Sequence, residues 1–210
     1  MRLYSYWRSS TAYRVRIALA LKGIDAEVVP VDLLAGQQAS DAYAALNPIK
    51  AVPTLVTDAG DVLTQSMAIL DYMDQIVPEP PLLPRDDAVR RARVLAAAMV
   101  LATDVHPVNN LKVLRRLQSL TGEDAGLPWV RHWLTEGLAA FAALIDPDTP
   151  FCFGDTPDLA DICLTAQLYN AHRWGVDLAP FARLAEIEAR CLALPAFDAA
   201  RPENQKDASR

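Results

Sequence analysis

The sequence is poor in the residues that build metal centres and disulfide frameworks. Among 210 residues there are only 3 cysteines and 3 histidines. The cysteines are too few and too irregularly spaced for a disulfide framework or a zinc site. The histidines form no H-E-x-x-H pattern, which would indicate a metalloprotease. We therefore expect no metal in this protein.

Positive charge and long apolar runs are also scarce. The chain has 20 Lys and Arg residues against 26 Asp and Glu, a formal net charge of −6. A nucleic-acid partner is not indicated by such a balance. No apolar run approaches membrane-spanning length, and the first residues lack the features of a secretory signal. We expect a soluble, cytoplasmic protein that binds neither nucleic acid nor membrane.

What the chain does have is enough apolar material for one large domain or two small ones. It is 52% hydrophobic and 22% charged. Four prolines between residues 77 and 84 indicate a stiff linker. Strand and helix patterns alternate before it, and only helical patterns follow it. We predict a small α/β domain over residues 1–80 and an all-α domain over residues 86–210, with a loose polar tail from Pro202.

The segment Ser9-Ser10-Thr11 lies where a strand over residues 1–6 turns into a helix that ends near Gly23. The first N–H groups of a helix have no internal partner, and its dipole favours an anion there. Three adjacent hydroxyls could add hydrogen bonds to that anion. The simpler interpretation is that one hydroxyl caps the helix. That interpretation leaves the flanking arginines unexplained.

Further strands are predicted over residues 26–33, 54–57 and 62–64, with a weak short helix over residues 41–46. Val52-Pro53 precedes an apolar strand, and composition alone allows either a strand edge or a cis peptide.

A second junction of strand and helix stands at Gln65-Ser66, with Ser66 as the candidate N-cap of a helix to Ile76. If the first and third strands are neighbours, both helix starts lie side by side and form one rim that attracts anions.

The second half of the chain reads as helix throughout. Asp158 is predicted to cap one helix, with Asp161 in its first turn. The predicted helices cover residues 86–120 with a bend near Pro107, 128–145, 159–174 and 179–192.

The segment from Ser9 to Leu19 resembles the signature S-S-C-x-x-R-V-R-I-A-L of the zeta-class glutathione transferases. This class contains the maleylacetoacetate and maleylpyruvate isomerases. Other segments resemble the class in register over nearly the whole chain: residues 21–24, 45–48, 52–55, 65–66, 109–114, 154–155, 159–161 and 176–178. The resemblance implies a thioredoxin-like N-terminal domain followed by an all-α C-terminal domain. One position departs from the signature, because Thr11 stands where the class has cysteine.

The resemblance implies a glutathione-dependent cis–trans isomerase with glutathione as cofactor. Its substrate would be a dicarboxylic keto acid, maleylacetoacetate or maleylpyruvate. In this hypothesis the glutathione thiolate adds to the cis double bond, the resulting single bond rotates, and the thiolate leaves. Thr11 does not oppose this chemistry, since the reacting sulfur belongs to glutathione. A redox role would require the missing cysteine.

The resemblance also assigns roles to individual residues. Catalysis falls to the three hydroxyls. The residues expected to bind glutathione are Ser9, Ser10, Thr11, Gln38, Val52, Pro53, Gln65, Ser66, His106, Asn109 and Asn110. Arg8 and Arg173 are expected to bind the two acidic ends of the substrate, because planar guanidinium groups suit carboxylates. The alternative for either arginine is a solvated ion pair, and for His106 a histidine at a helix kink.

Two other functions remain open at this level. A general glutathione-conjugating transferase of the same fold would have an open apolar site. A glutathione-transferase-like module that binds a partner protein would have lost the hydroxyls or Gln65-Ser66, and both are present. The resemblance further implies a homodimer.

Overall fold

The computed structural model describes residues 1–122 and 124–208. They pack into two compact units, which are described separately. The first contains residues 1–82 and the chain end from residue 193, and the second contains residues 83–192. The domain boundaries drawn from the sequence, 1–80 and 86–210, remain a prediction. In the part of the chain that is described, no helix is long and apolar enough to cross a membrane.

The first unit is built on a mixed sheet with the strand order β2-β1-β3-β4. Its strands are β1 (Arg2–Ser5), β2 (Glu27–Pro30), β3 (Thr54–Val56) and β4 (Val62–Thr64). β1 pairs parallel with β2 and antiparallel with β3. The first and third strands are therefore neighbours, which is the condition under which the two helix starts are expected to lie side by side. Leu3 stands opposite Leu55, and both side chains are fully buried.

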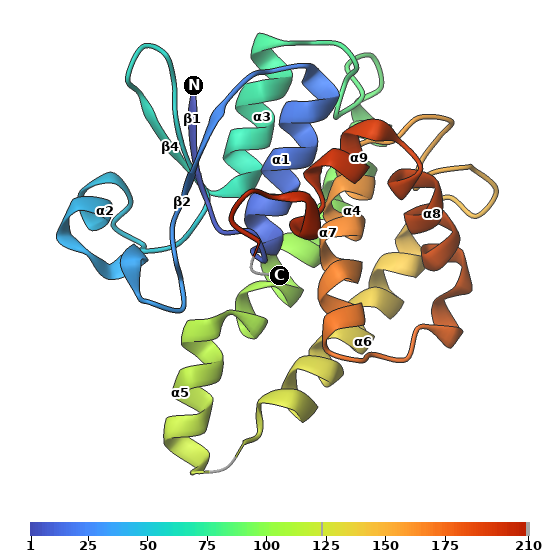
Figure 1. Cartoon of the computed structure of the whole chain (residues 1–210). Helices are drawn as coiled ribbons and strands as arrows, with labels where there is room; N and C mark the ends of the chain where they lie inside the picture. Colours follow the sequence, from blue (N-terminus) through green and yellow to red (C-terminus); the bar gives the residue numbers. More distant parts are fainter. Residues whose placement is uncertain (123, 209–210) are drawn as a thin grey trace. The chain divides into compact units, whose positions relative to one another are not determined.

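The helices of the first unit are α1 (Ser10–Lys22), α2 (Asp41–Leu46), α3 (Ser66–Ile76) and α9 (Pro195–Ala200), with short 3₁₀ turns η1 (Gln37–Ala39) and η5 (Pro202–Asn204). α1 begins and ends where the sequence predicts. Ser9 is its N-cap, and Gly23 ends it with a left-handed φ of 61°. Figure 1 shows α1 and α3 on one side of the sheet and α2 on the other. This arrangement agrees with the thioredoxin-like fold.

The expectation of a loose tail from Pro202 is wrong for the residues described. α9 packs on α1, beside which it lies in Figure 1. Phe197 is fully buried in this contact region and Ala200 is 4% exposed. The amide of Gln205 donates to the carbonyls of Ala199 and Arg201. Burial of apolar side chains from α9 therefore orders a segment whose own composition is polar.

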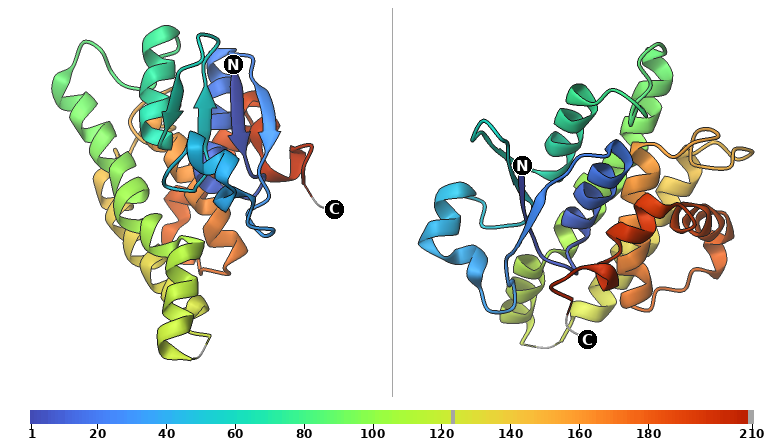
Figure 2. Two further views of the ribbon diagram at one scale, coloured as in Figure 1. Left: turned by 90° about the vertical axis from the view of Figure 1, so that its left-hand side faces the viewer. Right: turned by 45° about the horizontal axis from the view of Figure 1, so that its top comes forward.

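The second unit is helical. Its main helices are α4 (Ala88–Met99), α5 (Leu111–Thr121), α6 (Gly126–Leu144), α7 (Leu159–Arg173) and α8 (Ala182–Leu192), joined by η2 (Val100–Val105), η3 (Pro107–Asn109) and η4 (Ala179–Phe181). Figure 2 shows α5 and the first part of α6 running as an antiparallel pair. α7 lies in the core of this unit and packs on α4 and α8. The α/β and all-α parts predicted from the sequence are thus both present.

The single helix predicted over residues 86–120 is wrong. α4 ends at Met99, a π-helical segment follows, and Pro107 opens a 3₁₀ turn before α5. Proline lacks an N–H group and clashes with the preceding turn, so the helix cannot continue through it. Asn110 then caps α5 by accepting a hydrogen bond from the Lys112 N–H. Pro107 therefore separates two helices and does not bend a continuous one.

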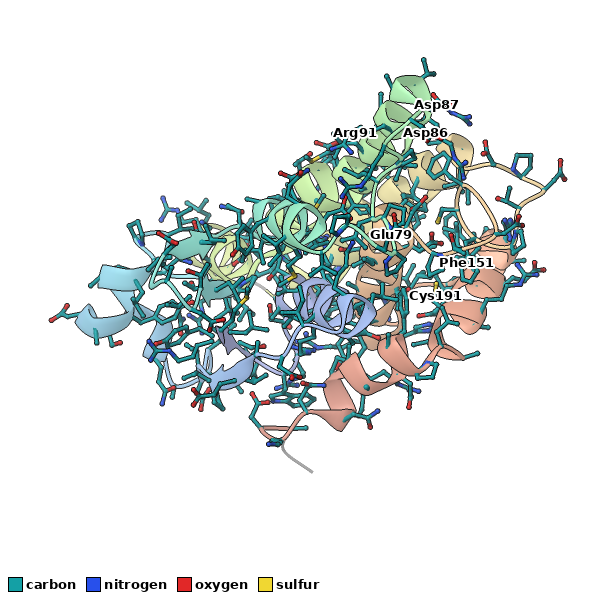
Figure 3. All side chains as sticks on the ribbon, turned by 90° about the horizontal axis from the view of Figure 1, so that it is seen from above. Glu79, Asp86, Asp87, Arg91, Phe151 and Cys191 are labelled. Carbon is teal, nitrogen blue, oxygen red and sulfur yellow. The ribbon has the colours of Figure 1, made fainter. Side chains whose placement is uncertain are left out.

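Side chains cap α4, α5 and α7 in the second unit. Asp158 and Asp161 form a complete capping box at the start of α7, as the sequence predicts. Asp87 caps α4 by accepting from the Arg90 N–H. Figure 3 labels Asp87 and Arg91 at the first turns of α4. Local sequence signals therefore set where these helices begin.

Candidate functional site

The hydroxyl run at the start of α1 is organised around Ser9. As the N-cap, the Ser9 Oγ accepts a hydrogen bond from the Ala12 N–H at 3.2 Å. Ser9 also lies 2.9 Å from Thr11, measured between the hydroxyl oxygens. The neighbouring Ser10 is the first residue of the helix and is 3% exposed. Ser9 therefore caps the helix, as the simpler interpretation predicts, and its hydroxyl lies at the positive end of the helix dipole.

Thr11 connects the start of α1 to the segment around Pro53. The Thr11 hydroxyl donates to the Val52 carbonyl at 2.9 Å. A hydroxyl has only one proton to donate, so in the Ser9–Thr11 pair the donor is Ser9. The result is an ordered chain of hydrogen bonds from Ser9 through Thr11 to Val52.

Val52-Pro53 is a cis peptide, one of the two possibilities that composition allows. The segment before it is held from within the same unit. The Tyr43 hydroxyl donates to the Ala51 carbonyl at 2.7 Å, and the Asn47 amide donates to the same oxygen at 2.8 Å. Val52 is 7% exposed and Pro53 is also buried. The carbonyl that Thr11 contacts therefore belongs to a fixed segment.

Gln65-Ser66 stands at the start of α3, but the predicted N-cap is one residue off. Gln65 occupies the cap position without a side-chain capping bond, and Ser66 is the first helical residue. Gln65 has a φ of 68°, a region that costs a residue other than glycine about 1–3 kcal/mol. The Ser66 side chain instead accepts a hydrogen bond from the Arg14 guanidinium at 3.4 Å. Arg14 is 1% exposed, so a buried positive charge lies next to this helix start.

Gln38 lies in the 3₁₀ turn η1 of the first unit. Its side-chain oxygen is buried and has no hydrogen-bond partner in the described structure. A buried acceptor without a donor is unfavourable by about 1–3 kcal/mol. A ligand with an N–H group can satisfy this atom, and glutathione has such groups.

Arg8 precedes the hydroxyl run and rests on an aromatic side chain. Its guanidinium carbon lies 4.6 Å from the centre of the Trp7 ring. Its Nη2 donates to the Tyr6 hydroxyl at 3.3 Å, and its buried Nε has no partner within the described residues. An unused N–H of a guanidinium group is a donor that a carboxylate can accept.

The three glutathione-binding candidates of the second unit lie at the break between α4 and α5, not on one long helix as predicted. His106 follows the π-helical segment, and its N–H donates to the Leu101 carbonyl at 3.1 Å. The Asn109 amide donates to the Val105 carbonyl at 3.0 Å, while its buried side-chain oxygen has no partner in the part of the chain described. Asn110 is occupied as the N-cap of α5. Asn109 is thus the best placed of the three to accept from a ligand.

Arg173 is the last residue of α7 and its side chain is exposed. Its guanidinium carbon lies 5.2 Å from the centre of the Trp174 ring. Arg8 and Arg173 therefore share one local arrangement, each in its own unit.

The protein's own thiols are unsuited to nucleophilic chemistry. All the cysteines are free and buried. Burial raises the pKa of Cys152 well above its ordinary value, and burial likewise raises the pKa of Cys191, which lies on α8 and is labelled in Figure 3. Both thiols are neutral near pH 7, and the thiolate is the reactive form. Among the described residues, no group of three or more His, Cys, Asp or Glu could hold a metal ion.

The sequence did not point to the residues that hold the site together. Arg14 is not among the candidate site residues, yet it bonds Ser66 within the first unit. Tyr43 and Asn47, which brace Ala51, were not singled out at all. One signal was available, because Arg14 and Arg16 stand at otherwise apolar positions of a helix. A buried arginine must find hydrogen-bond acceptors, and here it finds them at the site.

Comparison with known proteins matches the glutathione S-transferase N-terminal domain family to residues 1–75. A maleylacetoacetate isomerase from Pseudomonas aeruginosa is 44% identical, over 99% of this chain and 98% of the relative. The holo structure of a maleylpyruvate isomerase, a bacterial zeta-class glutathione S-transferase, is 41% identical with a TM-score of 0.96, covering 100% of both chains. A maleylacetoacetate isomerase from Methylobacterium extorquens AM1, with bound malonate and glutathione, is 37% identical with a TM-score of 0.95, again over 100% of both chains.

These similarities run through both units and agree with the fold and with the hydroxyl chain at the cis-proline. Such identity over the full length exceeds what a shared fold alone produces. The chain belongs to the glutathione transferase family, in the zeta-class group that contains the maleylacetoacetate and maleylpyruvate isomerases.

Proposed function

We propose that this protein is a glutathione-dependent cis–trans isomerase that converts a maleyl keto acid to its fumaryl isomer. The observation that carries the proposal is the extent of the similarity. It covers the helical second unit as well as the glutathione-binding domain that all members of the family share.

The residues of the first unit fit glutathione. Its γ-glutamyl carboxylate is an anion, and Gln65 and Ser66 offer a helix start with the buried Arg14 charge beside it. Gln38 offers a buried acceptor without a partner among the residues described. Val52 and Pro53 offer backbone groups to the cysteinyl part of the peptide. We assign the remaining contacts to His106, Asn109 and Asn110 of the second unit.

When bound, glutathione supplies a thiolate nucleophile that adds to the double bond of the substrate and is released again after rotation. Ser9 stabilises that negative charge by turning its proton from Thr11 towards the sulfur. Thr11 keeps its own proton on the Val52 carbonyl and holds the start of α1 in place. Ser10 adds a third hydroxyl, and the N-terminus of α1 adds its partial positive charge.

Arg8 and Arg173 bind the carboxylates of the substrate in this proposal. Each guanidinium rests on a tryptophan ring, which limits its motion, and the buried Nε of Arg8 has no partner among the described residues. Such fixed, permanently charged groups also stabilise negative charge that develops during the reaction.

The proposal extends to assembly and location. We place the protein in the cytoplasm as a homodimer, supported by its membership of the glutathione transferase family. Light scattering after gel filtration checks the assembly, and a mass of one chain would contradict it.

The experiment that tests the function compares two substrates in parallel. The purified protein is given maleylacetoacetate or maleylpyruvate, each with glutathione, and formation of the fumaryl isomer is followed. Turnover of one or both is expected, and the ratio of the rates identifies the physiological substrate. If neither is converted while the protein conjugates glutathione to an electrophile, the protein is a conjugating transferase instead.

A further inference from the structure

Trp7 is held at both of its backbone groups by charged side chains, those of Arg16 and Asp207. Its N–H donates to the side chain of Asp207, in the C-terminal segment, with 3.2 Å between the nitrogen and Oδ2. Its carbonyl accepts from the Arg16 guanidinium at 3.0 Å. Trp7 thus cannot move without breaking hydrogen bonds to charged groups, which are stronger than neutral ones.

Arg16 joins the same turn to the end of α9. Its side chain is 5% exposed in a helix that is otherwise apolar on that face. Besides Trp7 it bonds the Ser5 hydroxyl at 3.1 Å and the Ala200 carbonyl at 3.0 Å. The five N–H donors of a guanidinium allow one side chain to bridge all these groups. Arg16 therefore connects α9 to the turn before α1.

The position of Arg8 depends on these hydrogen bonds of Trp7, because Arg8 makes few contacts of its own. Its guanidinium rests on the Trp7 ring at 4.6 Å and bonds the hydroxyl of Tyr6, while its Nε has no partner within the described chain. The Tyr6 and Trp7 rings lie 6.2 Å apart, measured between their centres. A shift of Trp7 displaces the surface on which Arg8 lies.

From these contacts we propose that Asp207 and Arg16 are positioning residues for Arg8, and that the C-terminal segment after α9 takes part in binding the acidic substrate through Trp7. The inference rests on the proposed function in one respect, since it takes Arg8 as a carboxylate-binding residue. Asp207 itself does not contact the substrate in this account. It acts by accepting the Trp7 N–H.

Two substitutions at one position separate this role from a charge effect. Asp207→Ala removes the acceptor, whereas Asp207→Asn removes the negative charge and keeps a side-chain oxygen that accepts a hydrogen bond. Lys206→Ala is a matched control, because Lys206 is the adjacent exposed residue of the same segment. If Asp207 acted through its charge, the Ala and Asn variants would behave alike.

The first readout is hydrogen exchange of the Trp7 backbone amide, which needs no activity. In Asp207→Ala exchange should accelerate about 10-fold or more, because a hydrogen bond to a charged group is lost. Exchange in Lys206→Ala should stay close to wild type, and exchange in Asp207→Asn should fall between wild type and Asp207→Ala, because the remaining amide oxygen is a weaker, neutral acceptor. Unchanged exchange in Asp207→Ala would overturn the inference even if the isomerase assignment failed.

The second readout is kinetic. In Asp207→Ala the KM for the maleyl substrate should rise about 3- to 10-fold, as expected when one binding group is misplaced. The dissociation constant of glutathione should change less than the KM, since Ser9 is held separately by its hydrogen bonds to Ala12 and Thr11. An unchanged KM for the acidic substrate in Asp207→Ala, with the wild type active, would overturn the inference. An inactive wild type would overturn the proposed function, leaving the Trp7 exchange to decide whether Asp207 holds the turn.

Discussion

At the scale of single residues, the first unit shows why the class cysteine can be replaced. Thr11 donates to the Val52 carbonyl and accepts from Ser9, each at 2.9 Å. A thiol is a weaker donor and acceptor than a hydroxyl. With threonine at position 11, hydrogen bonds connect α1 to the cis-proline segment, and the thiol of the class is absent. This exchange suits a reaction whose sulfur comes from glutathione.

Ser9→Ala should lower kcat about 10- to 100-fold, because a hydrogen bond to a charged group contributes about 1.5–3 kcal/mol. It should also lower the unfolding free energy by about 1 kcal/mol, since Ser9 caps α1. Steady-state kinetics and urea unfolding measure the two effects. Ser9→Thr, which keeps a capping hydroxyl, serves as the control. Wild-type kcat in Ser9→Ala would remove Ser9 from the catalytic site.

Arg8→Ala should lower kcat/KM for the maleyl substrate about 10- to 100-fold, because a charge-assisted pair with a carboxylate is lost. Arg8→Lys should recover part of this loss, since it keeps the charge without the planar fork. Calorimetric titration with glutathione should give the wild-type affinity in both variants. Equal kcat/KM values for Arg8→Ala and wild type would show that Arg8 does not bind the substrate.

At the scale of elements, the sequence predicts the helices with local start and stop signals and fails where the signal is distant. Ser9, one of the three candidate caps, begins α1, and Gly23 ends it as expected. Asp158 and Asp161 form the capping box of α7. The break between α4 and α5 was predicted as a bend, because the hydrophobic period continues through Pro107. α9 was not predicted, since a six-residue helix has little propensity of its own and depends on packing against α1.

The candidate site shows the same difference between residues with a local sequence signal and residues whose role depends on distant contacts. Motif residues such as Ser9, Val52 and Gln65 could be named from the sequence because the resemblance is residue by residue. The residues that hold them, among them Arg14 and Asp207, could not. Their role depends on contacts across 52 and 200 positions of the chain, which no local pattern records. The one-residue error at Ser66 has a physical cause too, since the positive φ of Gln65 is not readable from residue type.

The connection between α1, α3 and the start of the linker depends on one buried ion pair. Lys22 Nζ lies 2.7 Å from Asp74 Oδ1, with side chains that are 0% and 2% exposed. Lys22 also donates to the carbonyls of Val77 and Pro80, and Asp74 accepts from the Leu82 N–H. Both charges are therefore satisfied only while these segments stay together.

Lys22→Met should reduce the unfolding free energy by about 3–5 kcal/mol, because Asp74 is left as a buried charge without its partner. Urea unfolding followed by circular dichroism measures this. Lys112→Ala, at an exposed lysine, should change it by less than about 0.5 kcal/mol. A loss in Lys22→Met as small as that of the control would show that the ion pair does not hold these segments.

At the scale of the whole molecule, the C-terminal end of the chain packs against its N-terminal part. The residues after α8 rejoin the first unit, where α9 packs on α1 and Asp207 bonds Trp7.

The negative net charge of −6 does not oppose an acidic substrate, because binding depends on the local field of groups such as Arg8. Buried, neutral cysteines leave the reacting sulfur to the cofactor.

The central claim is that a free glutathione thiol is required for isomerisation. The most direct measurement follows fumaryl product formation with glutathione, with S-methylglutathione, and with neither. We predict turnover only with glutathione, and competitive inhibition by S-methylglutathione, which fits the same residues but has no thiol. Equal turnover without glutathione, or with the methylated form, would contradict the account.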